Sequence, residues 1–160
     1  MKAKKTLILT CVAGILLSSL LYFYSPQEVA THFNSKGVPN GWMSKNTCFL
    51  FWIITYLLMT ALYLGIDGII KKMPEKFRGL PEKKEEQTQI ISRYVLTLGA
   101  TCNVFFITLE VIVFKANMHL RPSLNMTVAN TVIGIFTGYV IIWLILFLRK
   151  IRQFKRGENQ

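Results

Sequence analysis

The sequence predicts an all-α fold: a four-helix transmembrane bundle with both termini in the cytoplasm and a short ordered helix in the outer loop. Three observations predict it, namely four long apolar stretches, connecting loops too short to bury cores of their own, and cations gathered in alternate loops. Hydrophobic residues make up 52% of the 160 residues, and the mean hydropathy is +0.39. We therefore expect residues 1–160 to form a single integral membrane domain.

The four apolar stretches are residues 6–24, 48–70, 94–114 and 127–148. Each is long enough to cross the hydrocarbon core of a bilayer as a helix, which needs roughly 20 mainly apolar residues. The first stretch follows several lysines, as a secretory signal does, but it ends in the aromatic run Tyr22 to Tyr24. Such a run is typical of the membrane interface and not of a cleavage site, so we expect an uncleaved anchor.

The outer loop, residues 25–47, carries signals of local order. Residues 25–28 read Ser-Pro-Gln-Glu, the pattern of a helix N-terminus, which predicts a short interfacial helix that ends at residues 34–37. A second turn is expected at residues 38–41. The candidates for the N-cap of the second span are Ser44, Asn46 and Thr47.

The inner loop, residues 71–93, contains Pro74 and Pro81, so the second helix should end near Lys72 and the third should begin near Pro81. Most of the 19 lysines and arginines precede the first span, lie in this loop or follow the fourth span. By the positive-inside rule, this loop and both termini are cytoplasmic. The cations left for the outer side are Lys36, Lys45, Lys115 and Arg121.

The net charge of +11 does not indicate a nucleic-acid-binding protein, because the aromatic residues lie in the spans and not among the cations. The basic tail suits anionic lipid headgroups instead, so the lipid bilayer is an expected partner. The three cysteines, Cys11, Cys48 and Cys102, form no metal-binding or disulfide pattern and should act as small hydrophobic residues. No cofactor and no metal are expected.

Small and polar residues predict where the helices touch, since lipid supplies no hydrophobic force between them. We expect these stripes to pack within the chain, with a homodimer through Gly134 and Gly138 as the alternative. The stripes are Cys11, Gly14 and Ser18 in the first span; Gly99, Asn103, Phe106 and Glu110 in the third; and Thr127, Thr131, Gly134 and Gly138 in the fourth.

Glu110 is the most informative residue, because a carboxylate in lipid costs several kcal/mol unless it is paired, hydrated or protonated. One interpretation pairs it with an outer cation. A second turns it into the bundle, where it would work with Asn103 or His32, and a third makes it a neutral acid with a structural role. Asp67 should meet Lys71 or Lys72 at the inner interface. A zinc site of His32, His119 and Glu110 is conceivable, but its spacing matches no metal motif.

Residues 31–45 resemble part of the bacterial family called domain of unknown function 1648, in which a loop with His-Phe-Asn, Gly, Pro, Trp and Ser-Lys joins two membrane helices. The matching residues are Pro26, His32, Phe33, Asn34, Gly37, Pro39, Asn40, Trp42, Ser44 and Lys45. The resemblance covers residue 6 to about residue 70. It implies a rigid cap built by Phe33, Gly37, Pro39, Trp42 and Ser44, with His32, Asn34 and Lys45 turned toward the mouth of the bundle.

Such domains occur in the immunity protein of the sporulation-delaying toxin system, so the resemblance implies immunity or signalling, with a toxic peptide or a cytoplasmic regulator as partner. Our first hypothesis is accordingly a non-enzymatic membrane protein that confers immunity to, or senses, a secreted toxic peptide. Its candidate ligand-binding residues are His32, Asn34, Lys45, Asn103 and Glu110. The alternatives are a small transporter or transport subunit with a polar path through Glu110 and Asn103, and a zinc-dependent hydrolase. No catalytic residue is assigned.

Overall fold

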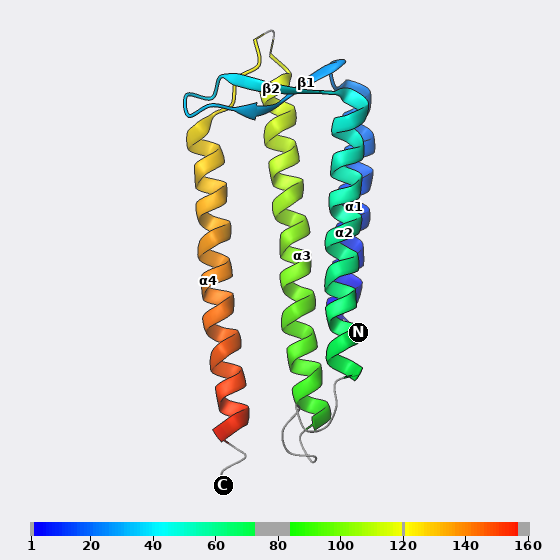
Figure 1. The fold of residues 1–160 in the computed structure, drawn as a ribbon, viewed down its shortest axis with the longest axis vertical. Helices are drawn as coiled ribbons and strands as arrows, with labels where there is room; N and C mark the ends of the chain where they lie inside the picture. Colours follow the sequence, from blue (N-terminus) through cyan, green and yellow to red (C-terminus); the bar gives the residue numbers. More distant parts are fainter. Residues whose placement is uncertain (1, 73–83, 120, 157–160) are drawn as a thin grey trace.

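A computed structural model describes residues 2–72, 84–119 and 121–156 of the chain, which form four long helices and one β-hairpin. The helices stand side by side, and the hairpin lies across one end of them (Figure 1). The predicted start of the third helix near Pro81 lies outside the described residues. The elements in chain order are α1 (Lys2–Tyr24), β1 (Glu28–Phe33), β2 (Pro39–Ser44), α2 (Lys45–Lys72), α3 (Lys84–Asn117) and α4 (Met126–Arg156).

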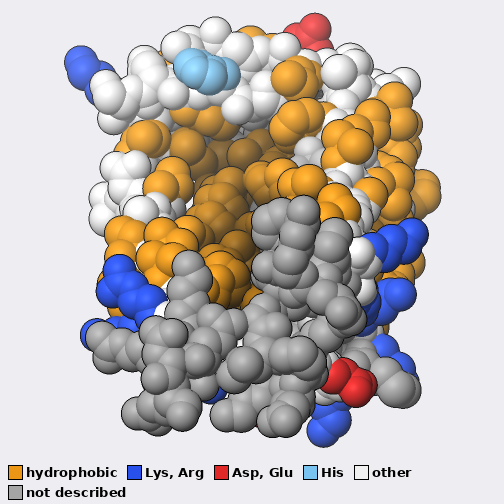
Figure 2. All heavy atoms as spheres, turned by 60° about the horizontal axis from the view of Figure 1, so that its bottom comes forward, with side chains coloured by type: hydrophobic (Ala, Val, Ile, Leu, Met, Phe, Trp, Pro, Cys, Tyr) orange, Lys and Arg blue, Asp and Glu red, His pale blue; other side chains and the backbone are white. Residues whose placement is uncertain are grey.

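All four helices are long and apolar enough to cross a membrane. The predicted spans 6–24, 48–70, 94–114 and 127–148 lie inside them, so the prediction of four long apolar helices is confirmed. Figure 2 shows hydrophobic side chains in a broad band across the face in view, while lysine and arginine gather near the end opposite the hairpin. Large apolar side chains on this band face outward, as they do in a protein whose solvent is lipid.

Helices α1, α2 and α3 pack together as a three-helix core. Their closest approaches place tyrosine rings over glycines: a Cβ atom added at Gly14 would stand 2.8 Å from the ring of Tyr56, and one added at Gly99 would stand 2.5 Å from the ring of Tyr63. The predicted stripes on the first and third spans are therefore confirmed as contact faces. Buried residues of α1 are Leu7, Cys11, Gly14 and Ser18.

Helix α4 packs chiefly on α3 through aromatic side chains. Phe136 stacks on Phe105 with ring centroids 4.0 Å apart, and the indole N–H of Trp143 donates to the carbonyl of Tyr94 at 3.2 Å. The predicted packing of the glycine stripe is wrong within the chain, because no described atom lies within 4 Å of a Cβ atom added at Gly134 or Gly138. The aromatic face of the helix makes the contact instead, since its rings have more surface to bury.

The outer loop forms a hairpin, so the prediction of a short helix there is wrong. Strand β1 pairs antiparallel with β2, with Glu28 opposite Ser44 and Val29 opposite Met43. The turn between the strands depends on Gly37, whose φ of 77° favours glycine. A capping pattern is a local signal, whereas the pairing of β1 is decided by a partner strand about ten residues away in the chain.

Candidate functional site

The hairpin is fastened to the end of the bundle by hydrogen bonds to α3 and to the α3–α4 loop. Asn117, near the end of α3, accepts from the backbone N–H of Ala30 at 2.7 Å and donates to the carbonyl of Ala30 at 2.9 Å. The backbone N–H of Leu124 donates to the carbonyl of Gly37 at 2.9 Å. The hairpin is thus a fixed cap over the three-helix core.

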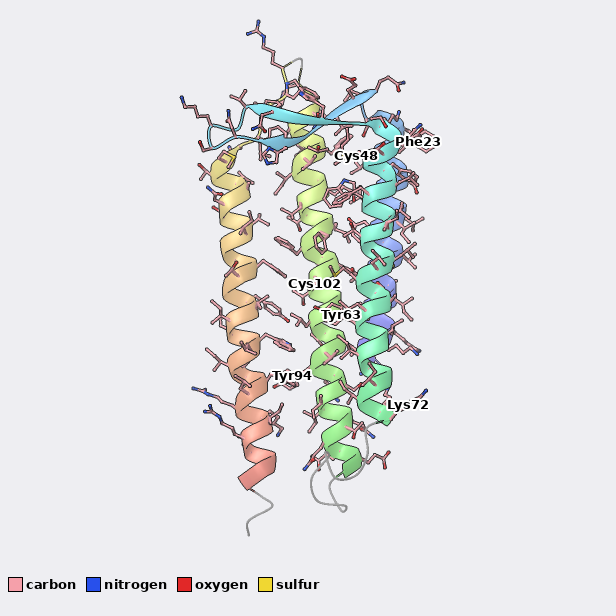
Figure 3. The ribbon with its side chains drawn as sticks, viewed as in Figure 1. Phe23, Cys48, Tyr63, Lys72, Tyr94 and Cys102 are labelled. Atoms are coloured by element: carbon pink, nitrogen blue, oxygen red, sulfur yellow. The ribbon has the colours of Figure 1, made fainter. Side chains whose placement is uncertain are left out.

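A cavity of about 30 Å³ lies beneath this cap. Residues from α1, β1, α2 and α3 form its wall, which includes Cys48, labelled near the hairpin in Figure 3. Its size suits about two water-sized groups. The lining residues are Ser18, Leu21, Tyr22, Ser25, Val29, Lys45, Cys48, Phe49, Trp52, Glu110, Val113, Phe114 and Asn117.

Glu110 is the one carboxylate among these lining residues, and its side chain is only 4% exposed. The hydroxyl of Tyr56 donates to Glu110 Oε2 at 2.7 Å. Within the described residues, no lysine or arginine forms an ion pair with Glu110. The structure therefore supports the interpretation in which Glu110 faces into the bundle, and it leaves the carboxyl group without the outer cation that the other interpretation required.

Ser18 lies in the same cavity wall, 2% exposed, where its hydroxyl interacts with Glu110 but forms no hydrogen bond of ordinary geometry with a described atom. An unpaired buried hydroxyl is costly, at roughly 1–3 kcal/mol, and such groups usually meet water or a ligand. Ser18 and Glu110 together give the cavity a polar end within otherwise apolar and aromatic walls. Such a combination is typical of a binding pocket.

Lys45 stands at the mouth of the cavity as the first residue of α2. Its Nζ atom lies 4.5 Å from the centroid of the Tyr22 ring, a cation–π contact. The hydroxyl of Tyr22 donates in turn to Asn46 at 2.8 Å. Lys45 and Glu110 are thus the two predicted ligand-binding residues that the structure brings to one cavity.

His32 and Asn34 do not line this cavity. His32 is exposed on the hairpin, where its Nδ1 lies 2.5 Å from Oδ1 of Asn40. Asn34 accepts from the backbone N–H groups of Lys36 and Val38 at 2.9 and 3.0 Å, which holds the turn. Both side chains thus serve the hairpin itself in this structure.

The residues predicted as a rigid cap do lie in the hairpin and its joint with α2. Ser44 accepts from the backbone N–H of Thr47 at 3.2 Å, so it provides the predicted N-cap of α2. Phe33 lies opposite Pro39 in the register, where β2 begins. Trp42 is half exposed on the outer surface, in keeping with an interfacial aromatic residue.

Asn103 is fully buried deeper in the core, in a second polar layer. Its amide donates to Thr60 at 3.1 Å and to Thr10 at 3.4 Å, and its Oδ1 has no partner among the described atoms. A third layer, at the opposite end from the hairpin, joins Asp67 to Lys71 at 2.6 Å and to the hydroxyl of Ser92. The predicted ion pair of Asp67 is therefore present.

Sequence reasoning missed two residues of α2: Tyr56, which donates to the carboxyl group of Glu110, and Trp52, which lines the same cavity. A signal was available, because Trp52, Tyr56 and Thr60 recur at intervals of four and so share one helix face. The part of the chain that the structure describes contains no group of three or more His, Cys, Asp or Glu residues placed to hold a metal ion. His119, proposed as a zinc ligand with His32, is an exposed residue just after α3.

Four apolar helices joined by short connections and capped by a fixed hairpin make this chain a multi-pass membrane protein. The family model of a domain of unknown function (DUF1648) matches residues 9–56, which run from α1 through the hairpin into α2. This match agrees with the resemblance seen in the sequence and covers less than half of the chain. No curated protein and no solved structure matches it.

Proposed function

We propose that this chain is a non-enzymatic binding protein of the bacterial plasma membrane, which takes its ligand from the outer side into the cavity beneath the hairpin. The observation that supports this most is Glu110, a buried carboxylate that lines an open cavity and has no ion-pair partner among the described residues. A buried carboxylate in a membrane protein costs free energy unless a cation, a hydrogen-bond donor or water compensates it. A ligand is the simplest candidate.

The proposal includes an orientation, with the hairpin outside and both termini in the cytoplasm. It is supported by the distribution of charge, because lysine and arginine gather near the end opposite the hairpin (Figure 2). α1 begins and α4 ends at that same end (Figure 1).

A labelling experiment tests the orientation. Single cysteines at Ser35 in the hairpin turn and at Arg149 in α4, both exposed, would be introduced into a chain whose three native cysteines are replaced by alanine. A membrane-impermeant maleimide should label intact cells at position 35 alone, and position 149 after lysis. Labelling of position 149 in intact cells would show that the orientation is the opposite one, and it would contradict the binding of a ligand from the outer side.

The ligand that the family resemblance favours is a secreted toxic peptide, so the proposed role is immunity to such a peptide or the sensing of it. Cells that carry the chain should tolerate membrane-active peptides from their own or related strains, and cells without it should not. Glu110→Gln should abolish that tolerance at an unchanged protein level. Lys115→Gln, which removes an exposed charge one and a half turns further along α3, is the matched control. Equal tolerance with and without the chain would reject the immunity role.

A second candidate function is transport, favoured by the three polar layers that α3 carries at Ser92, Asn103 and Glu110. Four helices would have to pair with a second copy to enclose a pathway, and the open face at Gly134 and Gly138 offers a surface for that. Against a path within one chain, the ring of Tyr56 packs over Gly14 between the middle and outer layers. Solute flux into vesicles that Glu110→Gln leaves unchanged would reject transport.

A further inference from the structure

Glu110 and Ser18 both present polar groups to the cavity, and both lack something that the described part of the chain does not supply. Glu110 lacks a positive charge, and the Ser18 hydroxyl, which interacts with the Glu110 carboxyl group, forms no hydrogen bond of ordinary geometry with a described atom. A ligand group that satisfies both must be positively charged and must donate hydrogen bonds. Ammonium groups and guanidinium groups meet this requirement.

The walls of the cavity narrow the choice toward an organic cation. Tyr22, Phe49, Trp52 and Phe114 line it around the single carboxylate. Aromatic faces attract ammonium groups, whereas an inorganic cation such as sodium would need several more oxygen ligands than this lining offers. The chain itself shows the preference, since its own Lys45 ammonium rests 4.5 Å from the Tyr22 ring at the mouth.

The small volume of the cavity favours a compact cationic group. A cavity of about 30 Å³ holds roughly two water-sized groups, which is the size of an ammonium head and one methylene group. A quaternary ammonium group carries no N–H and could not donate a hydrogen bond to Glu110 or Ser18. A compact primary ammonium group suits the small cavity better than a planar guanidinium group does. A primary amine enters, and the rest of the ligand remains in the open mouth.

We infer that the cavity beneath the hairpin binds the primary ammonium group of its ligand, with Glu110 as the counter-charge, Ser18 as a hydrogen-bond acceptor and Tyr22 as the aromatic face from which Lys45 is displaced. This inference rests on the proposed binding function and adds the chemical class of the ligand. Two sources supply such a group on the outer side of a bacterial membrane: a peptide amine and the headgroup of phosphatidylethanolamine. The chemistry of binding is the same for both.

Trp52 in the cavity wall allows a direct test with ethylammonium as the probe. The full chain, with Trp42→Phe and Trp143→Phe so that Trp52 is the single indole, would be purified in an uncharged maltoside detergent. Ethylammonium should change the Trp52 fluorescence saturably. Ethanol, sodium chloride and tetramethylammonium should not. An equal response to sodium or to tetramethylammonium, or no response to ethylammonium, would overturn the inference.

Variants assign the response to the cavity. Glu110→Gln should weaken ethylammonium binding by more than about tenfold, because it removes the counter-charge. Lys45→Met should strengthen binding by about threefold, because the competing ammonium is gone. Lys36→Met, in the exposed hairpin turn, is the control and should change nothing. The Lys45→Met result does not depend on whether Glu110→Gln folds, and an unchanged or weaker affinity in Lys45→Met would overturn the displacement of Lys45.

Two further arms separate the sources of the amine. Nanodiscs of phosphatidylglycerol with and without phosphatidylethanolamine test the headgroup, and a short lysine-containing peptide with its acetylated counterpart tests the peptide amine. Competition by either amine supports the ammonium site, and competition by the acetylated peptide equal to that of the free one contradicts it. Failure of the tolerance experiment with a normal ethylammonium response would reject immunity and leave the site in place, so the two failures are distinguishable.

Discussion

The hydroxyl of Tyr56 on α2 donates a hydrogen bond to the carboxyl group of Glu110 on α3 at 2.7 Å, and both side chains are buried. The bond joins two helices at the depth of the cavity beneath the hairpin. It also gives Glu110 a neutral partner, so the carboxyl group is held in place beside the cavity. The same hydrogen bond therefore stabilises the packing of α2 on α3 and holds a residue of the proposed binding site.

Tyr56→Phe tests this connection, because it removes the hydroxyl and keeps the ring in place. We expect the free energy of unfolding to fall by about 1–3 kcal/mol, since a buried carboxyl oxygen loses its partner. Tyr63→Phe is the matched control. Its hydroxyl meets the thiol of Cys102 at 3.4 Å, a weak bond, and its loss should cost less than about 1 kcal/mol. Thermal unfolding in detergent measures both, and an equal loss in the two variants would contradict the argument.

The four helices could be predicted from the sequence because a membrane span is a local property: about 20 apolar residues in a row and charges at the ends. The hairpin could not, because residues 25–33 combine a capping pattern that begins at Ser25 with the alternating β-branched residues Val29 and Thr31. Only the partner strand decides between a helix and a strand there. The turn at Gly37 was visible from the sequence, but the elements that flank it were not.

The candidate site could be predicted in part. Glu110 was identifiable as a costly group, and its stripe with Gly99 and Asn103 indicated the face that turns inward. Its partners could not be chosen, because Lys45, Lys115, His32 and Tyr56 all belong to segments whose relative positions depend on how the helices are arranged. The fourth span shows the same limit, since its glycines and its aromatic residues lie on different faces and sequence alone does not rank them.

Gly14→Ala tests the close packing that holds Tyr56. A Cβ atom at this position would stand 2.8 to 2.9 Å from three atoms of the Tyr56 ring, so the ring or the helix must move. We expect a loss of about 1–3 kcal/mol of stability, the usual cost of overpacking. Gly65→Ala is the control, since its added Cβ meets open space on α2 and should stabilise the helix by about 0.5–1 kcal/mol. The same sign for both variants in a thermal melt would refute this packing.

Gly37→Ala tests the turn of the hairpin. The φ of 77° disfavours any side chain, and an added Cβ atom would stand 2.1 Å from the carbonyl oxygen of Leu124. The hairpin should loosen, at a cost of at least about 1 kcal/mol. Limited trypsin digestion at Lys36 should then be several times faster than in the unsubstituted chain. Ser35→Ala, an exposed neighbour, should leave the digestion rate unchanged; a rate equal to that of Gly37→Ala would mean that the turn is not strained by the substitution.

Asn117→Ala tests the attachment of the hairpin to α3. The change leaves both backbone groups of Ala30 without their partner in a buried position, at about 1–3 kcal/mol for each group. We expect faster amide hydrogen exchange at Ala30 and Val29, while exchange in the middle of α3 remains slow. Lys115→Ala, two residues earlier and exposed, should change neither. Exchange at Ala30 that stays slow in Asn117→Ala would show that other contacts hold the hairpin.

Gly134→Leu tests whether the open face of α4 pairs with a second copy of the chain. Because no described atom lies within 4 Å of an added Cβ atom at Gly134 or Gly138, a larger side chain fits the single chain without a clash. The monomer should therefore keep its thermal stability within about 0.5 kcal/mol, as for most surface substitutions.

In a homodimer held by a Gly-x-x-x-Gly contact, the same leucine would keep the two backbones apart. Cross-linking in vesicles should accordingly show a dimer for the unsubstituted chain and a monomer for Gly134→Leu. Ile135→Leu, an exposed neighbour on a different face of α4, should retain the dimer. If the unsubstituted chain is itself monomeric at every protein-to-lipid ratio, transport through a paired pathway is rejected, while a single chain with one cavity beneath its hairpin still suffices for binding.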